Sequence, residues 1–196
     1  MTTEANAFRV LSAVLAREPS SEMRDRLADG LLHDLLPVAA DDPEAMAALD
    51  RVAAAAAADP GDPPRRLAAA FAGLFLGGGG KRSALPFASV YRSPTGRLFQ
   101  EPAVAMTDLL RRADLDLAPG AEAPDHVAVQ LALLADLLER GDPASLALAA
   151  ELRDAELLPW LPDFVADCAR FDASGLYAAA SFLALWLARR DAAHDR

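Results

Sequence analysis

The sequence contains one cysteine, Cys168, and one lysine, Lys81, in 196 residues. A single cysteine excludes an intrachain disulfide and favours a reducing compartment. Histidine is also scarce, and none of the three is followed, three or four residues along a helix, by a second metal-binding side chain. The sequence therefore predicts neither a disulfide scaffold nor a metal site, and it indicates no cofactor.

Long apolar runs are missing as well. The most apolar stretch, residues 175–188, is short and rich in alanine, so it does not suit a bilayer crossing. The first residues include Glu4 but no basic region, unlike a secretory signal peptide. The three Arg-Arg pairs lie far from the N-terminus, where they cannot serve as the chain's own twin-arginine export signal. We expect a soluble, cytoplasmic protein with no stable membrane insertion.

Positive charge is scarce relative to negative charge. The formal net charge is −10 and the isoelectric point is near 4.7. Such a chain repels phosphates, which argues against a nucleic-acid ligand. A basic partner fits better, and acidity that serves only solubility is the simpler alternative.

Alanine is abundant and β-branched residues are few, a balance that favours helices. Apolar residues recur with helical spacing almost throughout, as in Leu67, Phe71, Leu74 and Phe75. No repeat or linker divides the chain. We therefore expect an all-α fold, a single globular bundle of about eight to ten helices that forms one domain over residues 1–196.

One region, residues 77–100, lacks this periodicity. It holds glycines, two prolines and the turn-like sequence SPTG, but no alternating strand pattern. The aromatic residues Phe87, Tyr91 and Phe99 argue against disorder, so we predict a long ordered loop. Ordered loops of this length in a compact domain are usually functional.

Four glycines followed by Lys81 invite comparison with a phosphate-binding loop. The Walker pattern requires a glycine where this chain has Phe75, and a serine or threonine where it has Arg82. The run also follows a predicted helix, whereas a P-loop follows a strand. We interpret the glycines as a helix end and the start of a flexible connection.

Pro124, Asp125 and His126 form the most suggestive polar cluster. With Pro124 at the first position of a helix, Asp125 and His126 fall in its first turn, where the helix dipole stabilises an aspartate. Three roles are open for the pair: helix cap, ligand recognition and acid–base catalysis. Catalysis has the least support, because adjacent helical residues do not face each other and no motif places a nucleophile.

Trp160, in the sequence LLPWLPDF, and the loop sequence LPFASVY are rich in apolar and aromatic residues. Taken singly, each of these side chains is expected in the core. Taken together with an acidic helix start, the aromatic loop could frame a groove for an apolar, basic peptide.

Three segments, in this order, resemble the TorD/DmsD family of maturation chaperones for molybdoenzymes, which is related to the NarJ type. The first, residues 71–106, is similar to the family's Leu-Phe-x-Gly, Ser-Val-Tyr (or Ser-Val-Trp) and Leu-Phe-Gly. The second, EAPDHVAVQLALLADLL, is similar to its Glu-Pro-x-Asp-His helix start, and the third, ELLPWLPDFVADC, to its Pro-Trp segment. Together they span residues 71–171.

The resemblance implies an all-helical chaperone, not an enzyme. Such chaperones bind the twin-arginine signal peptide, and the apo form, of a DMSO- or TMAO-reductase-like catalytic subunit before cofactor insertion and export. Domain-swapped dimers are known in the family, so a homodimer is allowed, and guanine-nucleotide binding has been proposed for it, although the residues show no site. Carried over by position, the implied peptide-binding residues are Leu74, Phe75, Pro86, Phe87, Ser89, Tyr91, Glu122, Asp125, His126 and Trp160.

The chemistry of these residues agrees with such a ligand. Asp125 and Glu122 could bind arginine through charge-assisted hydrogen bonds, and the aromatic residues could supply an apolar groove. The chain departs from the family pattern at four positions, which bear on the identity of the partner more than on the function: Phe87 replaces a common tryptophan, Gln100 a glycine, Ala123 a proline and Glu156 a histidine.

Two alternatives stay open. One is a NarJ-like assembly factor for a membrane oxidoreductase complex, which would act without recognising a signal peptide. The other is a small all-α hydrolase or nucleotide enzyme that uses Asp125 and His126.

Overall fold

The computed structural model describes residues 3–78, 80–118 and 120–194 of the chain. Within these residues the secondary structure is helical apart from one isolated bridge, which confirms the all-α prediction. Eleven α-helices are present, one more than the upper end of the expected range. They are α1 (Thr3–Ala16), α2 (Ser21–Ala28), α3 (Leu31–Leu35), α4 (Pro43–Ala57), α5 (Arg65–Phe75), α6 (Ala88–Arg92), α7 (Glu101–Arg112), α8 (Val127–Arg140), α9 (Pro143–Glu151), α10 (Leu161–Phe171) and α11 (Leu176–His194).

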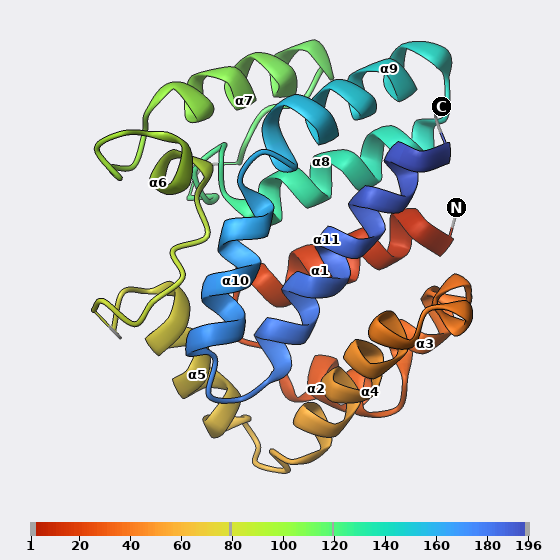
Figure 1. Cartoon of the computed structure of the whole chain (residues 1–196), viewed down its shortest axis with the longest axis vertical. Coiled ribbons are helices and arrows are strands. Elements are labelled where there is room, and N and C mark those ends of the chain that lie inside the picture. The colour runs from red at the N-terminus through yellow and green to blue at the C-terminus, as the bar shows by residue number, and fades with distance from the viewer. Residues whose placement is uncertain (1–2, 79, 119, 195–196) are drawn as a thin grey trace.

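The longest helices form the centre of the bundle. Helix α1 packs against α8 on one side and α11 on another, and α11 also packs against α4 and α10 (Figure 1). The apolar stripe of α1, formed by Phe8, Leu11 and Leu15, is completely buried at these contacts. Burial of such stripes, rather than intrinsic helix propensity, provides most of the stability of helices of this length.

Asp-Pro sequences, which are typical of helix starts, precede three helices, and two of them form caps. Before α5 the N-cap is Pro64, and the expected cap by Asp62 does not form. Asp42 caps α4 by accepting hydrogen bonds from the main-chain N–H groups of Glu44 and Ala45. Asp142 caps α9 in the same way. In both helices proline occupies the first turn, where its missing N–H costs nothing.

The start of α8 differs from the prediction. The helix begins at Val127, and His126 is its N-cap, so Asp125 and His126 precede the first turn instead of lying in it. The reason is tertiary: the main chain here pairs with residues 86–88. Val127 N–H donates to the Pro86 carbonyl at 2.8 Å, and Ala88 N–H donates to the Asp125 carbonyl at 3.0 Å.

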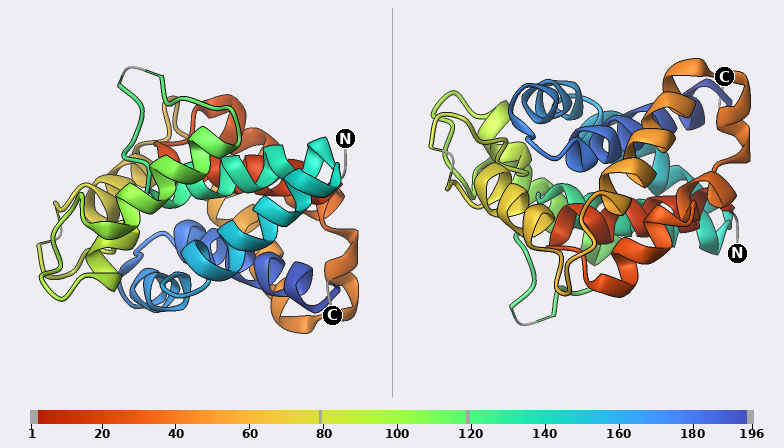
Figure 2. Two further views of the ribbon diagram at one scale, coloured as in Figure 1. Left: turned by 90° about the horizontal axis from the view of Figure 1, so that it is seen from above. Right: turned by 90° about the horizontal axis from the view of Figure 1, so that it is seen from below.

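Over residues 80–100, the part of the predicted loop after the gap in the described residues, the chain is not a continuous loop, because it contains the short helix α6. Helix α5 ends as expected, with Leu76 as C-cap and Gly77 in the left-handed region at φ 74°. The loops of this region lie at the end of the molecule opposite to the two chain termini (Figure 2).

Helices α9 and α10 are joined by a π-helical turn, Leu152–Leu157, followed by residues 158–160. A short 3₁₀ segment, Pro37–Asp41, connects α3 to α4. In the part of the chain that the structure describes, no helix is both long enough and apolar enough for a membrane crossing.

Candidate functional site

Residues of the first two family-like segments meet in one unit, which we call the latch: residues 84–92 together with Asp125 and His126. The Asp125 carboxylate, fully buried, accepts a hydrogen bond from the Ser89 N–H at 2.8 Å. The Ser89 hydroxyl oxygen in turn accepts from the Gln100 N–H at 3.0 Å. One carboxylate thus fixes the first turn of α6, and α6 fixes the entry to α7.

His126 holds the other side of the latch. Its Nδ1 accepts a hydrogen bond from the Ala128 N–H at 3.0 Å, which caps α8. Its ring meets the Phe87 ring edge-on, with centroids 4.9 Å apart. Burial lowers the pKa of His126 to about 4, so the ring is neutral at pH 7, as an accepting Nδ1 requires. The nitrogen used for capping is therefore not available for acid–base chemistry.

Tyr91 joins the latch to the segment that follows the π-helical turn. Its ring lies 5.5 Å from that of Trp160 and 6.2 Å from that of Phe164. The Tyr91 hydroxyl donates to Asp167 at 3.2 Å, and the buried indole N–H of Trp160 donates to Gln130 Oε1 at 3.2 Å. Burial is the main cause that raises the pKa of Tyr91, so its phenol stays protonated at ordinary pH.

Leu74 and Phe75 lie deeper than the sequence alone indicates. Both are buried in α5, and the Phe75 ring stacks on Phe164 at 5.9 Å and meets Tyr177 edge-on at 5.3 Å. The Leu74 carbonyl accepts from the Ala84 N–H at 2.8 Å, which ties α5 to the start of the latch.

The predicted site residues thus divide by exposure. Glu122 is exposed, and Phe87 and Tyr91 are half-buried. The remaining seven are buried: Leu74, Phe75, Pro86, Ser89, Asp125, His126 and Trp160. Of the four rings of the predicted aromatic groove, Phe75 and Trp160 are buried against other rings, whereas Phe87 and Tyr91 keep part of their surface exposed. The binding role of these residues stays a prediction.

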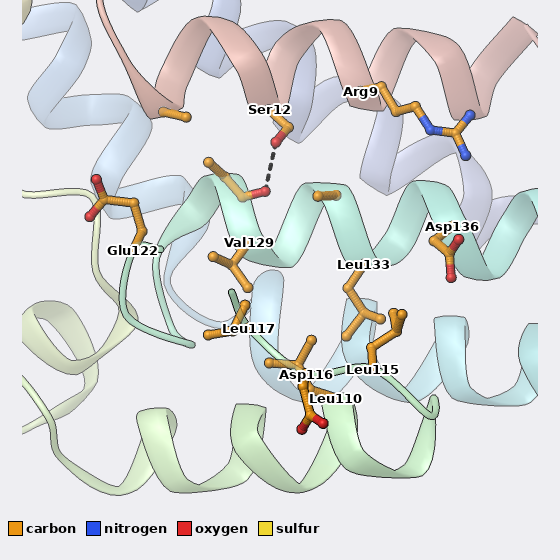
Figure 3. A pocket seen from close by; sticks show the side chains of 13 residues that line it. Arg9, Ser12, Leu110, Leu115, Asp116, Leu117, Glu122, Val129, Leu133 and Asp136 are labelled. Atoms are coloured by element: carbon orange, nitrogen blue, oxygen red, sulfur yellow. Dashed lines mark hydrogen bonds between the residues drawn. The ribbon is translucent and has the colours of Figure 1, made fainter. Parts of the chain in front are cut away.

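An open cavity lies beside the latch, between α1, α7 and α8, with a volume of about 520 Å³ (Figure 3). We call it the α1–α8 cavity. The segment between α7 and α8 forms one wall and includes Glu122. Its apolar lining consists of Ala16, Leu110, Leu115, Leu117, Ala128, Val129, Ala132 and Leu133, and its polar lining of Arg9, Ser12, Asp116, Glu122 and Asp136.

Some of the charged side chains at this cavity form ion pairs with described residues and others do not. Arg9 forms an ion pair with Glu139, and Asp136 pairs with Arg140 at 2.7 Å. For Asp116 and Glu122, which are both exposed, the described residues provide no ion-pair partner. The unpaired charges at the rim are therefore negative.

Sequence reasoning identified only Glu122 in this cavity. Its other lining residues come from three helices and a loop far apart in the chain, so no local pattern collects them. Leu115, Asp116 and Leu117 lie in a stretch of the sequence without helical periodicity, and all three line the cavity.

Comparisons with known proteins agree with the three-segment resemblance. A family model described as "Nitrate reductase delta subunit" matches residues 38–166. A protein named "Chaperone protein TorD" from Vibrio cholerae serotype O1 (strain ATCC 39541) is 41% identical over 139 residues; the match covers 66% of this chain but only 62% of that relative. A protein of the same name from Escherichia coli O157:H7 is 32% identical over 198 aligned positions, which cover 95% of this chain and 94% of the relative.

The fold has a counterpart among solved structures. A crystal structure from Archaeoglobus fulgidus, described as that of a redox enzyme maturation protein, superposes with a TM-score of 0.60. The superposition covers 95% of this chain and 94% of the other, at 14% sequence identity. At that identity the likeness demonstrates a shared fold.

Proposed function

The chain belongs to the family of the TorD chaperones and the nitrate reductase delta subunit, and from this premise we propose that it is a cytoplasmic maturation chaperone for a molybdoenzyme. It acts by binding, as one domain, and its client is the apo form of a DMSO- or TMAO-reductase-like catalytic subunit. The observation that carries the proposal is the match to a protein named TorD chaperone along nearly the full length of both chains.

The ligand of the chaperone is the client's twin-arginine signal peptide, which it retains until the cofactor has been inserted. Two features support this ligand. The net charge of −10 accelerates encounter with a basic peptide. Family-like residues that lie far apart in sequence are in contact, Ser89 with Asp125 and Tyr91 with Trp160.

The predicted site residues serve this function at two levels. Glu122, Phe87 and Tyr91 are accessible enough to touch a peptide. The buried residues, among them Asp125 and His126, hold these side chains in place through the latch.

Isothermal titration with a leader peptide from a neighbouring molybdoenzyme tests the proposal. We expect binding to the native leader and markedly weaker binding when its two arginines are replaced by lysines, because lysine cannot form the paired hydrogen bonds of a guanidinium. A chain that binds neither peptide, while it co-purifies with an enzyme subunit that has no leader, is not a signal-peptide chaperone.

That second outcome describes the alternative function, a NarJ-like assembly factor for a membrane oxidoreductase complex. The description of the matching family model as the nitrate reductase delta subunit favours it. Under this alternative, the Arg-Arg to Lys-Lys change has no effect on complex formation with the client.

A further inference from the structure

We propose that the α1–α8 cavity is where the leader peptide binds, with Asp116 and Glu122 holding its arginine side chains and the apolar floor covering its hydrophobic stretch. The inference rests on the proposed function, and it assigns the arginines and the hydrophobic stretch of the ligand to a surface beside the latch, not to its buried residues. Three observations carry it: the volume of the cavity, the order of its lining side chains, and the balance of its charges.

The cavity is large enough for several side chains of an extended or helical peptide. Its volume of about 520 Å³ lies within the range of roughly 300–1,000 Å³ that is usual for ligand sites. Its floor includes Leu117 and Val129, which are half-buried, and Ala132, which is exposed. Apolar side chains that remain accessible in a hollow gain from being covered by an apolar ligand.

Asp116 and Glu122 flank the apolar floor, and this arrangement suits a ligand that has both apolar and cationic groups. In Figure 3, Leu117 and Val129 lie between Glu122 at one end and Asp116 at the other. A ligand seated on the two apolar residues can therefore extend a guanidinium toward either acid. Since the described residues offer neither acid an ion-pair partner, an incoming arginine displaces no existing pair.

The arginine that lines the cavity, Arg9, is already in an ion pair, and so is Arg140, close to the lining residue Asp136. Arg9 pairs with Glu139, and Arg140 pairs with Asp136. On the adjacent turn of α7, Arg112 pairs with Glu151 at 2.6 Å. These ion pairs reduce the repulsion that an incoming arginine would otherwise meet, and they leave the rim with a net negative charge.

Two smaller cavities on the α4, α10 and α11 side suit such a ligand less well. Their volumes are about 290 and 260 Å³. Arg51 lines the first, and Arg189 and Arg190 line the second. The α1–α8 cavity is the better match, because it is larger and the one arginine that lines it, Arg9, already forms an ion pair with Glu139.

The test measures binding of a fluorescent peptide, with two consecutive arginines followed by an apolar run, to the full-length chain. We expect Asp116→Asn and Glu122→Gln each to weaken binding by about 5- to 10-fold, and the double variant by about 30-fold or more. The matched control is the double variant Glu22→Gln, Asp34→Asn, which removes the same charge from exposed positions on α2 and α3. It should stay within about twofold of the wild type, because it changes only the long-range field.

The apolar floor is tested separately with Ala132→Trp. Because Ala132 is exposed on α8, a large side chain there fills the cavity without disturbing the core. We expect binding to fall by about 10-fold or more while the melting temperature stays unchanged. A second variant, Ala132→Cys, carries a photo-crosslinker and should attach to the bound peptide; Cys168 is buried and does not compete for the reagent.

The outcomes separate the two proposals. If the wild type binds the peptide and all cavity variants bind it equally well, the cavity assignment is wrong and the chaperone function stands. If the control double variant weakens binding as much as Asp116→Asn with Glu122→Gln, the effect is long-range electrostatics and the assignment is again overturned. If the wild type itself binds no arginine-bearing leader, the proposed function fails.

Discussion

The Asp125 carboxylate accepts a hydrogen bond from the Ser89 N–H at 2.8 Å, across 36 residues of sequence. Through the Ser89 hydroxyl the same connection reaches the Gln100 N–H, at the entry to α7. The Asp-His pair, for which the sequence leaves capping, recognition and catalysis open, therefore has a structural role in this conformation. It sets the positions of α6, α7 and the start of α8, and with them the walls of the α1–α8 cavity.

Replacing Asp125 should loosen this connection. In Asp125→Ala, the buried Ser89 N–H loses a charged acceptor, so we expect the free energy of unfolding to fall by about 2 kcal/mol. Urea denaturation followed by circular dichroism measures the change. The comparison is Asp34→Ala, an exposed aspartate on α3, for which we expect a change within about 0.5 kcal/mol. Equal stability of the two variants contradicts a structural role for Asp125.

His126 should make stability depend on pH. Burial lowers its pKa from 6.5 to about 4, so the unfolded chain takes up a proton in this interval and the folded chain does not. The stabilisation is complete above pH 6.5 and is lost as the pH falls toward 4, by up to about 3 kcal/mol. In His126→Asn, which keeps an N-cap side chain but does not titrate, the slope between pH 7 and pH 5 should be smaller. Identical slopes in variant and wild type would show that His126 is not the titrating group.

Tyr91 should couple the latch to Trp160. The chain has two tryptophans, so Trp186→Phe leaves Trp160 as the only fluorescent indole. In that background we expect Tyr91→Ala to shift the emission to the red and to lower the free energy of unfolding by about 2 kcal/mol, because a half-buried ring is lost. Tyr91→Phe keeps the ring and loses only the hydroxyl contact with Asp167, so the cost should be about 1 kcal/mol or less. An unchanged emission maximum in Tyr91→Ala argues against the coupling.

Replacing Phe99 with glycine should stabilise the folded chain. Its φ of 57° lies in the left-handed region, and its side chain is 70% exposed, so strain is relieved and little burial is lost. We expect Phe99→Gly to raise the free energy of unfolding by up to about 1 kcal/mol. Val104, equally exposed but within α7, is the matched control, and Val104→Gly should lower the free energy by about 0.5 kcal/mol. Calorimetry shows whether each variant gains or loses stability. If both variants lose stability, strain at Phe99 is ruled out.

Helix boundaries could be predicted from the sequence where interactions between neighbouring residues determine them. The Asp42 and Asp142 caps and the glycine at the end of α5 depend only on neighbouring residues, although the same Asp-Pro pattern at Asp62 does not cap α5. The start of α8 and the presence of α6 were missed for a single reason. Both depend on main-chain and carboxylate contacts between residues 86–89 and 125–127, and no pattern within either segment reveals the pairing.

The helical class, the acidic character, the absence of an intrachain disulfide and the family all follow from the sequence, because composition, spacing and ordered motifs are properties of the chain. Which motif residues stay accessible depends on the packing of the folded chain. Packing buries Asp125, His126 and Trp160, whereas it leaves Glu122 exposed at the rim of a cavity together with Asp116. The exposure of a side chain depends on what the rest of the fold places over it, and for these residues the covering segments come from distant parts of the chain.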